Sequence, residues 1–246
     1  MKIKIVIFPG SNCDHDAEYA FRNLLEQDVE MVWHKEESLG NCDLVVLPGG
    51  FSYGDYLRTG AMARYSPIMR PVERFARDGG LVFGICNGFQ ILCEAGLLPG
   101  ALMKNACLQF RCMHVDLRVE TTGSPLTRYL RQGQILKIPI AHGDGNYYAD
   151  DATLNELIDN DCILFRYSTP DGLILPEANP NGSCYSIAGI CNQDRNVFGM
   201  MPHPERAVEA SLGSADGLSI LRSLIRSVES DSGANRSESH HSASVA

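Results

Sequence analysis

The chain has 246 residues, of which 44% are hydrophobic and 21% charged, an ordinary composition for a globular protein. Its formal net charge is −9 at pH 7, from 21 lysines and arginines against 30 aspartates and glutamates. This balance argues against broad binding to nucleic acids or anionic membranes, because neutralising phosphate groups requires clustered basic side chains. The composition is compatible with an enzyme that acts on a small molecule and with a subunit that binds other proteins.

The cysteines indicate a reducing environment. There are nine of them, an odd number in a long chain, unlike the paired cysteines of small secreted proteins. The apolar run at the N-terminus is too short for a signal peptide. No stretch reaches the roughly 18 apolar residues that a membrane-spanning helix needs. We therefore expect a soluble, cytoplasmic protein.

In the first half of the sequence, predicted strands and helices alternate. Short β-branched runs that end at proline or glycine predict buried strands, and apolar residues at helical spacing predict the helices between them. The expected strands are Ile3–Phe8, Leu44–Leu47 and Leu81–Ile85, and the expected helices cover residues 17–25, 67–76 and 87–95, the second of them capped by Ser66. This alternation predicts a parallel sheet covered by helices on both faces.

The second half is richer in strands and ends in a change of composition. We expect strands at Val115–Val119, Ile135–Ile140, Ile163–Tyr167, Tyr185–Ile190 and Val197–Met200, followed by an amphipathic helix that ends near Val228. From Glu229 onward, serine, asparagine, glycine and histidine dominate. The sequence thus predicts one α/β domain over residues 1–228, with three layers (α/β/α) around a mostly parallel sheet. Residues 229–246 are predicted to form a disordered tail.

A cysteine at a strand-to-helix turn is the first sign of chemistry. Cys86 follows the predicted strand Leu81–Ile85, opens a helix, and has Gly84 and Gly88 two residues to either side. This is the nucleophile-elbow pattern, with sulfur in place of the serine oxygen. A helix terminus supplies only about 0.3–1 kcal/mol, so an ionised cysteine at such a turn also needs a cationic neighbour, most often histidine. Alternatively, Cys86 is a small buried hydrophobic residue, as most free cysteines are.

A histidine and a glutamate near the end of the domain favour the catalytic interpretation. His203 and Glu205 follow the strand Val197–Met200, where a chain leaves the carboxyl edge of a parallel sheet. Proline at position 204 favours extended backbone at His203. Residues i and i+2 of an extended chain point to the same side, so Glu205 can orient the imidazole. Cys86, His203 and Glu205 therefore form a candidate catalytic triad.

A glycine pair supplies the third element. Gly49 and Gly50 directly follow the strand Leu44–Leu47. Their backbone N–H groups can stabilise an oxyanion together with the N–H group of Asn87, the residue after the candidate nucleophile. Without the other two elements, Pro48-Gly49-Gly50 would be interpreted as an ordinary turn.

Taken together, these segments resemble the class I, triad-type glutamine amidotransferases. The resemblance covers residues 1 to about 228 and includes the Pro-Gly-Gly loop, the Gly84–Gln90 segment and the His203-Pro204-Glu205 end. Three segments narrow it to the glutaminase subunits of purine biosynthesis: Gly50–Asp55, Cys86–Gln90 and Ala141–Gly145.

The resemblance implies roles for individual residues. Cys86 would be the nucleophile, His203 the base and Glu205 its partner. The loop of Gly49 and Gly50 would supply an oxyanion N–H group, as would Asn87. The side chain of Gln90 would help to hold the substrate glutamine.

The resemblance also implies a partner. Ammonia would pass to a separate ATP-dependent synthetase subunit, accompanied by a small accessory subunit. No cofactor is expected in this chain, since it contains neither a G-x-x-x-x-G-K-[ST] phosphate loop nor a G-x-G-x-x-G segment opening a helix. ATP and Mg²⁺ are expected in the synthetase. We expect no metal site, because Cys107, Cys112 and His114 lack a fourth ligand.

Two other function classes stay open at this stage. A related cysteine hydrolase of the same fold would share the turn at Cys86 but would need no synthetase. A non-catalytic redox sensor or scaffold would use Cys86 without requiring His203 and Glu205 nearby.

Overall fold

The computed structural model describes the backbone of residues 1–241 and the side chains of residues 1–230. Within these residues, nine strands form one sheet in the order β2-β1-β3-β4-β11-β10-β9-β6-β7, and β5 pairs with β8 in a separate small sheet. The strands are β1 Lys2–Ile7, β2 Asp28–Trp33, β3 Leu44–Leu47, β4 Leu81–Ile85, β5 Ala101–Met103, β6 Arg111–Val119, β7 Ile135–His142, β8 Asn146–Tyr148, β9 Ile163–Ser168, β10 Ile187–Cys191 and β11 Val197–Met200.

The sheet is mixed, with a parallel core. The strands β2, β1, β3, β4 and β11 pair in parallel, whereas β11, β10, β9, β6 and β7 pair antiparallel. The predicted α/β fold is confirmed, but antiparallel pairing is more extensive than expected. The reason lies in the second half of the chain, where a short loop over residues 192–196 joins β10 to β11. A loop of that length can connect only antiparallel neighbours.

The helices follow the prediction in part. They are α1 Asp14–Glu18, which continues as a π-helix over Tyr19–Leu24, α2 Met69–Arg77, α3 Asn87–Glu94, α4 Asp151–Asp159 and α5 Asp216–His241. The prediction that Ser66 caps the second helix is wrong. The helix begins at Met69, and the hydroxyl of Ser66 lies 2.9 Å from the hydroxyl of Tyr53 instead.

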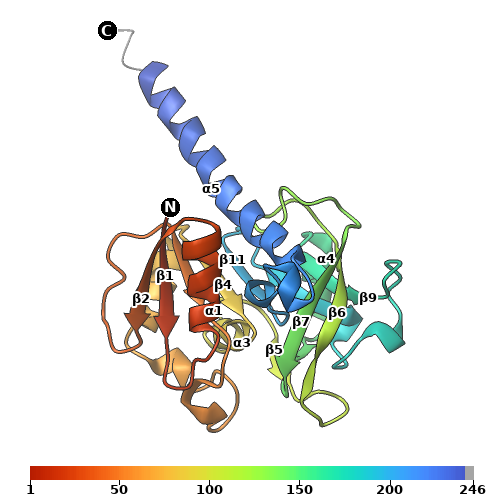
Figure 1. Cartoon of the computed structure of the whole chain (residues 1–246). Coiled ribbons are helices and arrows are strands. Elements are labelled where there is room, and N and C mark those ends of the chain that lie inside the picture. The colour runs from red at the N-terminus through yellow and green to blue at the C-terminus, as the bar shows by residue number, and fades with distance from the viewer. Residues whose placement is uncertain (242–246) are drawn as a thin grey trace.

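The last helix extends beyond the boundary expected from composition. Helix α5 packs on the sheet through Ile220, Leu221, Leu224 and Ile225 and then projects away from it (Figure 1). Its backbone is helical to His241, whereas we expected disorder from residue 229 onward. No proline follows Pro204, so nothing in the sequence forces the helix to stop. Residues 242–246 lie outside the described part of the chain. The domain boundary at residue 228 stays a prediction.

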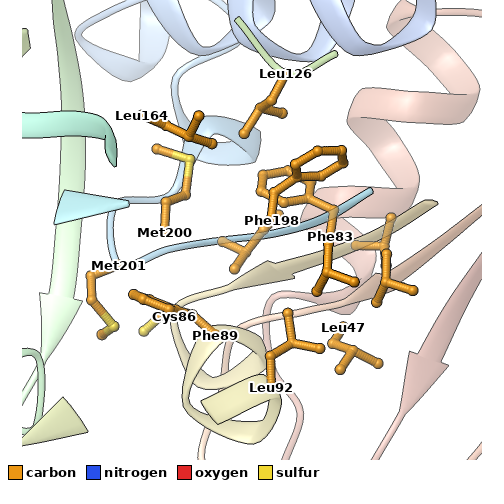
Figure 2. Packing of buried hydrophobic residues seen from close by; sticks show 14 of the residues in the cluster. Leu47, Phe83, Cys86, Phe89, Leu92, Leu126, Leu164, Phe198, Met200 and Met201 are labelled. Atoms are coloured by element: carbon orange, nitrogen blue, oxygen red, sulfur yellow. The ribbon is translucent and has the colours of Figure 1, made fainter. Parts of the chain in front are cut away.

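In the middle of the sheet, buried aromatic side chains of β4 and β11 pack against each other. Phe83 of β4 and Phe198 of β11 lie with ring centroids 6.5 Å apart, and Figure 2 shows them in one cluster with Leu126 and Leu164. The strands are in parallel register, with Ile85 opposite Met200. Their carboxyl ends therefore lie side by side, so that Cys86 and the segment after Met200 enter the same region. Among the described residues, no helix combines the length and the apolarity needed to span a bilayer.

Candidate active site

Cys86 occupies a strained turn between β4 and α3. Its backbone has φ +51° and ψ −105°, a positive-φ conformation that is costly for a residue with a side chain. The flanking glycines make the turn possible. A Cβ atom on Gly88 would come within 1.9 Å of the carbonyl oxygen of Leu47, and one on Gly84 within 2.6 Å of the backbone of Gly88. The thiol of Cys86 is buried and donates to the carbonyl oxygen of Ala141 at 3.8 Å.

His203 and Glu205 form a buried pair just beyond β11. Nδ1 of His203 lies 2.7 Å from Oε1 of Glu205, and the backbone N–H of His203 donates to the carbonyl oxygen of Pro139 at 2.8 Å. Burial by itself lowers the pKa of the His203 imidazole, but the charges of Glu205 and Cys86 more than offset it. The pKa therefore lies well above its ordinary value. Among the described residues, Nε2 has no hydrogen-bond partner, so it is available to exchange a proton with a substrate or a thiol.

The glycine pair lies beside His203. A Cβ atom on Gly49 would come within 2.7 Å of Cε1 of His203, and one on Gly50 within 2.7 Å of the carbonyl oxygen of Gly10. From the other side, the backbone N–H groups of Asn12 and Cys13 donate to the carbonyl oxygen of Gly49 at 3.3 and 3.2 Å. Side chains are therefore excluded from this loop by contacts on two sides. The loop therefore borders the candidate base, His203, and its role in binding an oxyanion stays a prediction.

Asn87 and Gln90, at the start of α3, connect two loops. Oδ1 of Asn87 accepts from the N–H of Ser52 at 3.1 Å, and its Nδ2 donates to Oε1 of Gln90 at 2.8 Å. Nε2 of Gln90 then donates to the carbonyl oxygen of Asp144 at 2.6 Å. The side-chain amide of Gln90 is thus engaged at both ends. These bonds position the loop that contains Asp144, and they leave one N–H of Nε2 and one lone pair of Oε1 for other partners.

His142, at the end of β7, is a buried neutral histidine. Asn105 fixes its tautomer: the Asn105 amide nitrogen donates to the carbonyl oxygens of Gln109 and His142, so its Oδ1 accepts from Nδ1 of His142 at 3.1 Å. Burial, aided by the charge of His203, lowers the pKa of His142 to about 4. Nε2 of His142 is therefore an unprotonated acceptor near neutral pH.

Cys13 is a site residue that the sequence analysis missed. It is buried, and its sulfur lies within 4.8 Å of ligand atoms of both His203 and Glu205. The sequence contains a sign of this position, because Pro9-Gly10 ends β1 in the same way that Pro48-Gly49 ends β3. Since β1 and β3 are parallel neighbours, the segments that follow them meet at one edge of the sheet. That adjacency is a property of the fold and cannot be seen from spacing in the chain.

The family is decided by comparison with known proteins. A family model described as a CobB/CobQ-like glutamine amidotransferase domain matches residues 1–216. The chain belongs to this family. Its resemblance to class I glutamine amidotransferases, inferred from the residues alone, is confirmed.

Individual members of the glutamine amidotransferase family are similar along nearly the whole chain. Phosphoribosylformylglycinamidine synthase subunit PurQ of Salinibacter ruber is 58% identical, covering 91% of this chain and 95% of its own length. The protein of the same name in Koribacter versatilis is 59% identical, covering 92% of this chain and 97% of its own length. A chain in the structure of PurLQS from Thermotoga maritima superposes with a TM-score of 0.81 at 42% identity, covering 92% of this chain and 97% of that one.

Proposed function

We propose that this chain is the glutaminase subunit of phosphoribosylformylglycinamidine synthase, an enzyme of purine biosynthesis. The proposal rests on one observation: a cysteine with a strained backbone and a buried histidine–glutamate pair lie at the same edge of the sheet. Cys86 follows β4 and His203 follows β11, and these two strands are parallel neighbours. The relatives that share more than half of their residues with this chain carry the name of that subunit.

The proposed reaction begins at the sulfur of Cys86. The thiolate attacks the side-chain carboxamide of glutamine, and N–H groups of Gly50 and Asn87 stabilise the oxyanion that forms. His203, oriented by Glu205, holds the proton taken from the thiol and gives it to the amide nitrogen, which leaves as ammonia. Water then attacks the glutamyl thioester with His203 as base, which releases glutamate and restores the thiol. The high pKa of His203 supports its role as proton donor.

The ammonia is used elsewhere. We propose that it passes to an ATP-dependent synthetase subunit, which converts formylglycinamide ribonucleotide to formylglycinamidine ribonucleotide. ATP and Mg²⁺ belong to that partner, and no cofactor is assigned to this chain. The similarity to a chain of the PurLQS assembly supports association with a synthetase and a small accessory subunit. The nine free thiols support a reducing, cytoplasmic location.

The test is a glutaminase assay with the synthetase partner present. We expect Cys86→Ala to lose at least a thousandfold in rate, because removing a covalent nucleophile abolishes the main pathway. Glu205→Gln should lose on the order of a hundredfold or more, because it leaves the imidazole poorly oriented. Cys93→Ala, on the same helix α3, is the matched control and should keep full activity.

The same assay separates the alternatives. Undiminished hydrolysis by Cys86→Ala would contradict the proposal. Hydrolysis that the synthetase does not stimulate would favour a related cysteine hydrolase. Binding to the synthetase with no glutamine-dependent formation of amidine would favour a scaffold.

A further inference from the structure

A cluster of metal-ligating side chains lies at the active site, and one of its members has no part in the proposed reaction. The sulfur of Cys13, a ring nitrogen of His203 and a carboxylate oxygen of Glu205 lie within 4.8 Å of one another, and all three residues are buried. Thiolate, imidazole and carboxylate are the ligand types that Zn²⁺ takes in proteins. Three protein ligands also leave one position of a tetrahedral site open to water.

One carboxylate oxygen of Glu205 is not used in its bond to His203. Its Oε1 lies 2.7 Å from Nδ1 of His203, whereas its Oε2 is buried and has no hydrogen-bond partner among the described residues. A buried polar atom left unpaired is costly, and a bound cation satisfies it. A second ligand, the sulfur of Cys13, approaches the same edge of the imidazole. A Cβ atom on Gly49 would lie 2.9 Å from that sulfur and 2.7 Å from Cε1 of His203.

A cavity provides a route to the cluster. It has a volume of about 500 Å³ and is lined by both His203 and Glu205. Two further carboxylates line it, those of Asp16 and Glu209. Arg206 pairs with Asp16 at 2.8 Å, while among the residues with described side chains Glu209 accepts from a neutral hydroxyl, that of Tyr19, at 3.2 Å. Negative charge at the cavity wall attracts a cation.

We propose that Zn²⁺, or another divalent cation that prefers sulfur and nitrogen ligands, binds Cys13, His203 and Glu205 and switches off the glutaminase. This inference rests on the proposed function. The cation binds the sulfur of Cys13, Nδ1 of His203 and the carboxylate of Glu205, and the protons of the Cys13 thiol and of Nδ1 are both released to water. A neutral imidazole bound through Nδ1 carries its single proton on Nε2. It cannot accept a proton there, so the nucleophile is no longer activated.

The binding test is spectroscopic and does not depend on activity. Co²⁺ is added to the full-length chain as a probe, and thiolate-to-cobalt charge-transfer absorption is measured together with metal stoichiometry. We expect about one tightly bound ion per chain in the wild type and in Cys86→Ala, and loss of the charge-transfer band in Cys13→Ser and Cys13→Ala. Cys112→Ser is the matched control, because Cys112 lines the same cavity. Circular dichroism shows that each variant is folded.

Zn²⁺ inhibition is then measured in the complex with the synthetase. We expect the concentration for half-inhibition to rise about tenfold or more in Cys13→Ser, each variant being compared with its own metal-free rate. A cobalt–thiolate band that disappears in Cys86→Ala but persists in Cys13→Ser would overturn the proposal, as would the absence of any thiolate band in the wild type. If the band is present in the wild type and lost in the Cys13 variants, but the complex has no glutaminase activity, the proposed function is contradicted and the metal site is not.

Discussion

Asp55 lies in a strained loop next to the glycine pair. Tyr53, Asp55 and Leu57 all have positive φ values, of +56°, +54° and +71°. One carboxylate oxygen of Asp55 is buried without a partner among the described residues. Burial, aided by the charge of Asp144, raises the pKa of Asp55 to about 6. Ionising this carboxylate therefore works against folding near neutral pH.

The sign of the resulting pH dependence follows from proton binding. Between about pH 4 and 6 the native state holds the Asp55 proton more tightly than the unfolded state, so the free energy of unfolding falls as the pH rises through this window. Asp55→Asn removes the ionisation and tolerates the left-handed backbone. We expect it to stabilise the protein by ~1 kcal/mol above pH 7, a value reduced because the group is partly solvated.

Urea unfolding at pH 4 and at pH 7.5 checks this expectation. The advantage of Asp55→Asn should vanish at pH 4, where Asp55 is neutral in the native state. Asp194→Asn, in an exposed turn, is the control for the same substitution at the surface. An equal gain for Asp55→Asn at both pH values would show that the carboxylate charge is not the cause.

Helix α5 is held to the rest of the domain by contacts along the part whose side chains the structure describes, up to Ser230. Up to residue 228 its inner face is buried, and the hydroxyls of Ser223 and Ser227 both donate to the carbonyl oxygen of Pro125, at 3.2 and 3.0 Å. Ser230 still reaches the hydroxyl of Tyr129, at 2.7 Å. The helix beyond this point projects away from the sheet (Figure 1). Anchoring contacts are thus found on the segment that composition assigned to the domain and at Ser230, two residues beyond it.

Truncation tests that boundary. A chain ending at Ser230 should keep its free energy of unfolding within about 0.5 kcal/mol, since it keeps the buried face of the helix. A chain ending at Ile220 loses the buried side chains of Leu221, Leu224 and Ile225. At about 1.5–3 kcal/mol for each side chain, this loss is comparable with the whole stability of a domain. Urea denaturation of both chains gives the comparison. A large loss in the longer chain would place the boundary further along the helix.

The elements that the sequence predicted best are those at the centre of the sheet. Strands β3, β4 and β11 were predicted at their observed ends, because they are apolar runs buried on both faces and bounded by turn residues. Strand β2 was missed. It lies at the edge of the sheet, and its exposed Asp28 and Glu30 interrupt the apolar pattern. Helix α4 was also missed, although Asp150 caps it by accepting from the N–H of Thr153 at 2.8 Å.

The same distinction applies to the candidate site. Cys86, His203 and Glu205 could be identified because each lies in a local pattern of glycine, proline or spacing that limits the backbone. Cys13 could not, because its place beside His203 depends on β1 and β3 being neighbours. The engaged amide of Gln90 could not be foreseen either, since its partner Asp144 is far away in the sequence.

At the scale of the whole molecule, the nine cysteines give a simple test of the structure. All lie within the described residues and all are free thiols. Cys107 and Cys112 are exposed, and hydrogen bonding to the backbone of Gln109, with a smaller effect from Arg111, lowers the pKa of the Cys107 thiol. The thiols that react fastest with a bulky reagent are therefore expected on the surface near the start of β6.

We expect a bulky disulfide reagent to modify Cys107 first and Cys112 next in the native chain. After denaturation without a reductant, the same reagent should modify nine thiols. Peptide mapping identifies the sites, and Cys107→Ser should remove the fastest phase. Fewer than nine thiols in the denatured, unreduced chain would reveal a disulfide and contradict the structure.

Strand β11 is made late yet occupies the middle of the sheet, between β4 and β10. The first strands can assemble while the chain is still being synthesised, but the place beside β4 stays vacant until β11 emerges from the ribosome. Cys86 is then present without its proposed base, since His203 follows β11. A nascent or prematurely ended chain thus cannot consume glutamine, and the enzyme acquires its activity only when its synthesis is nearly complete.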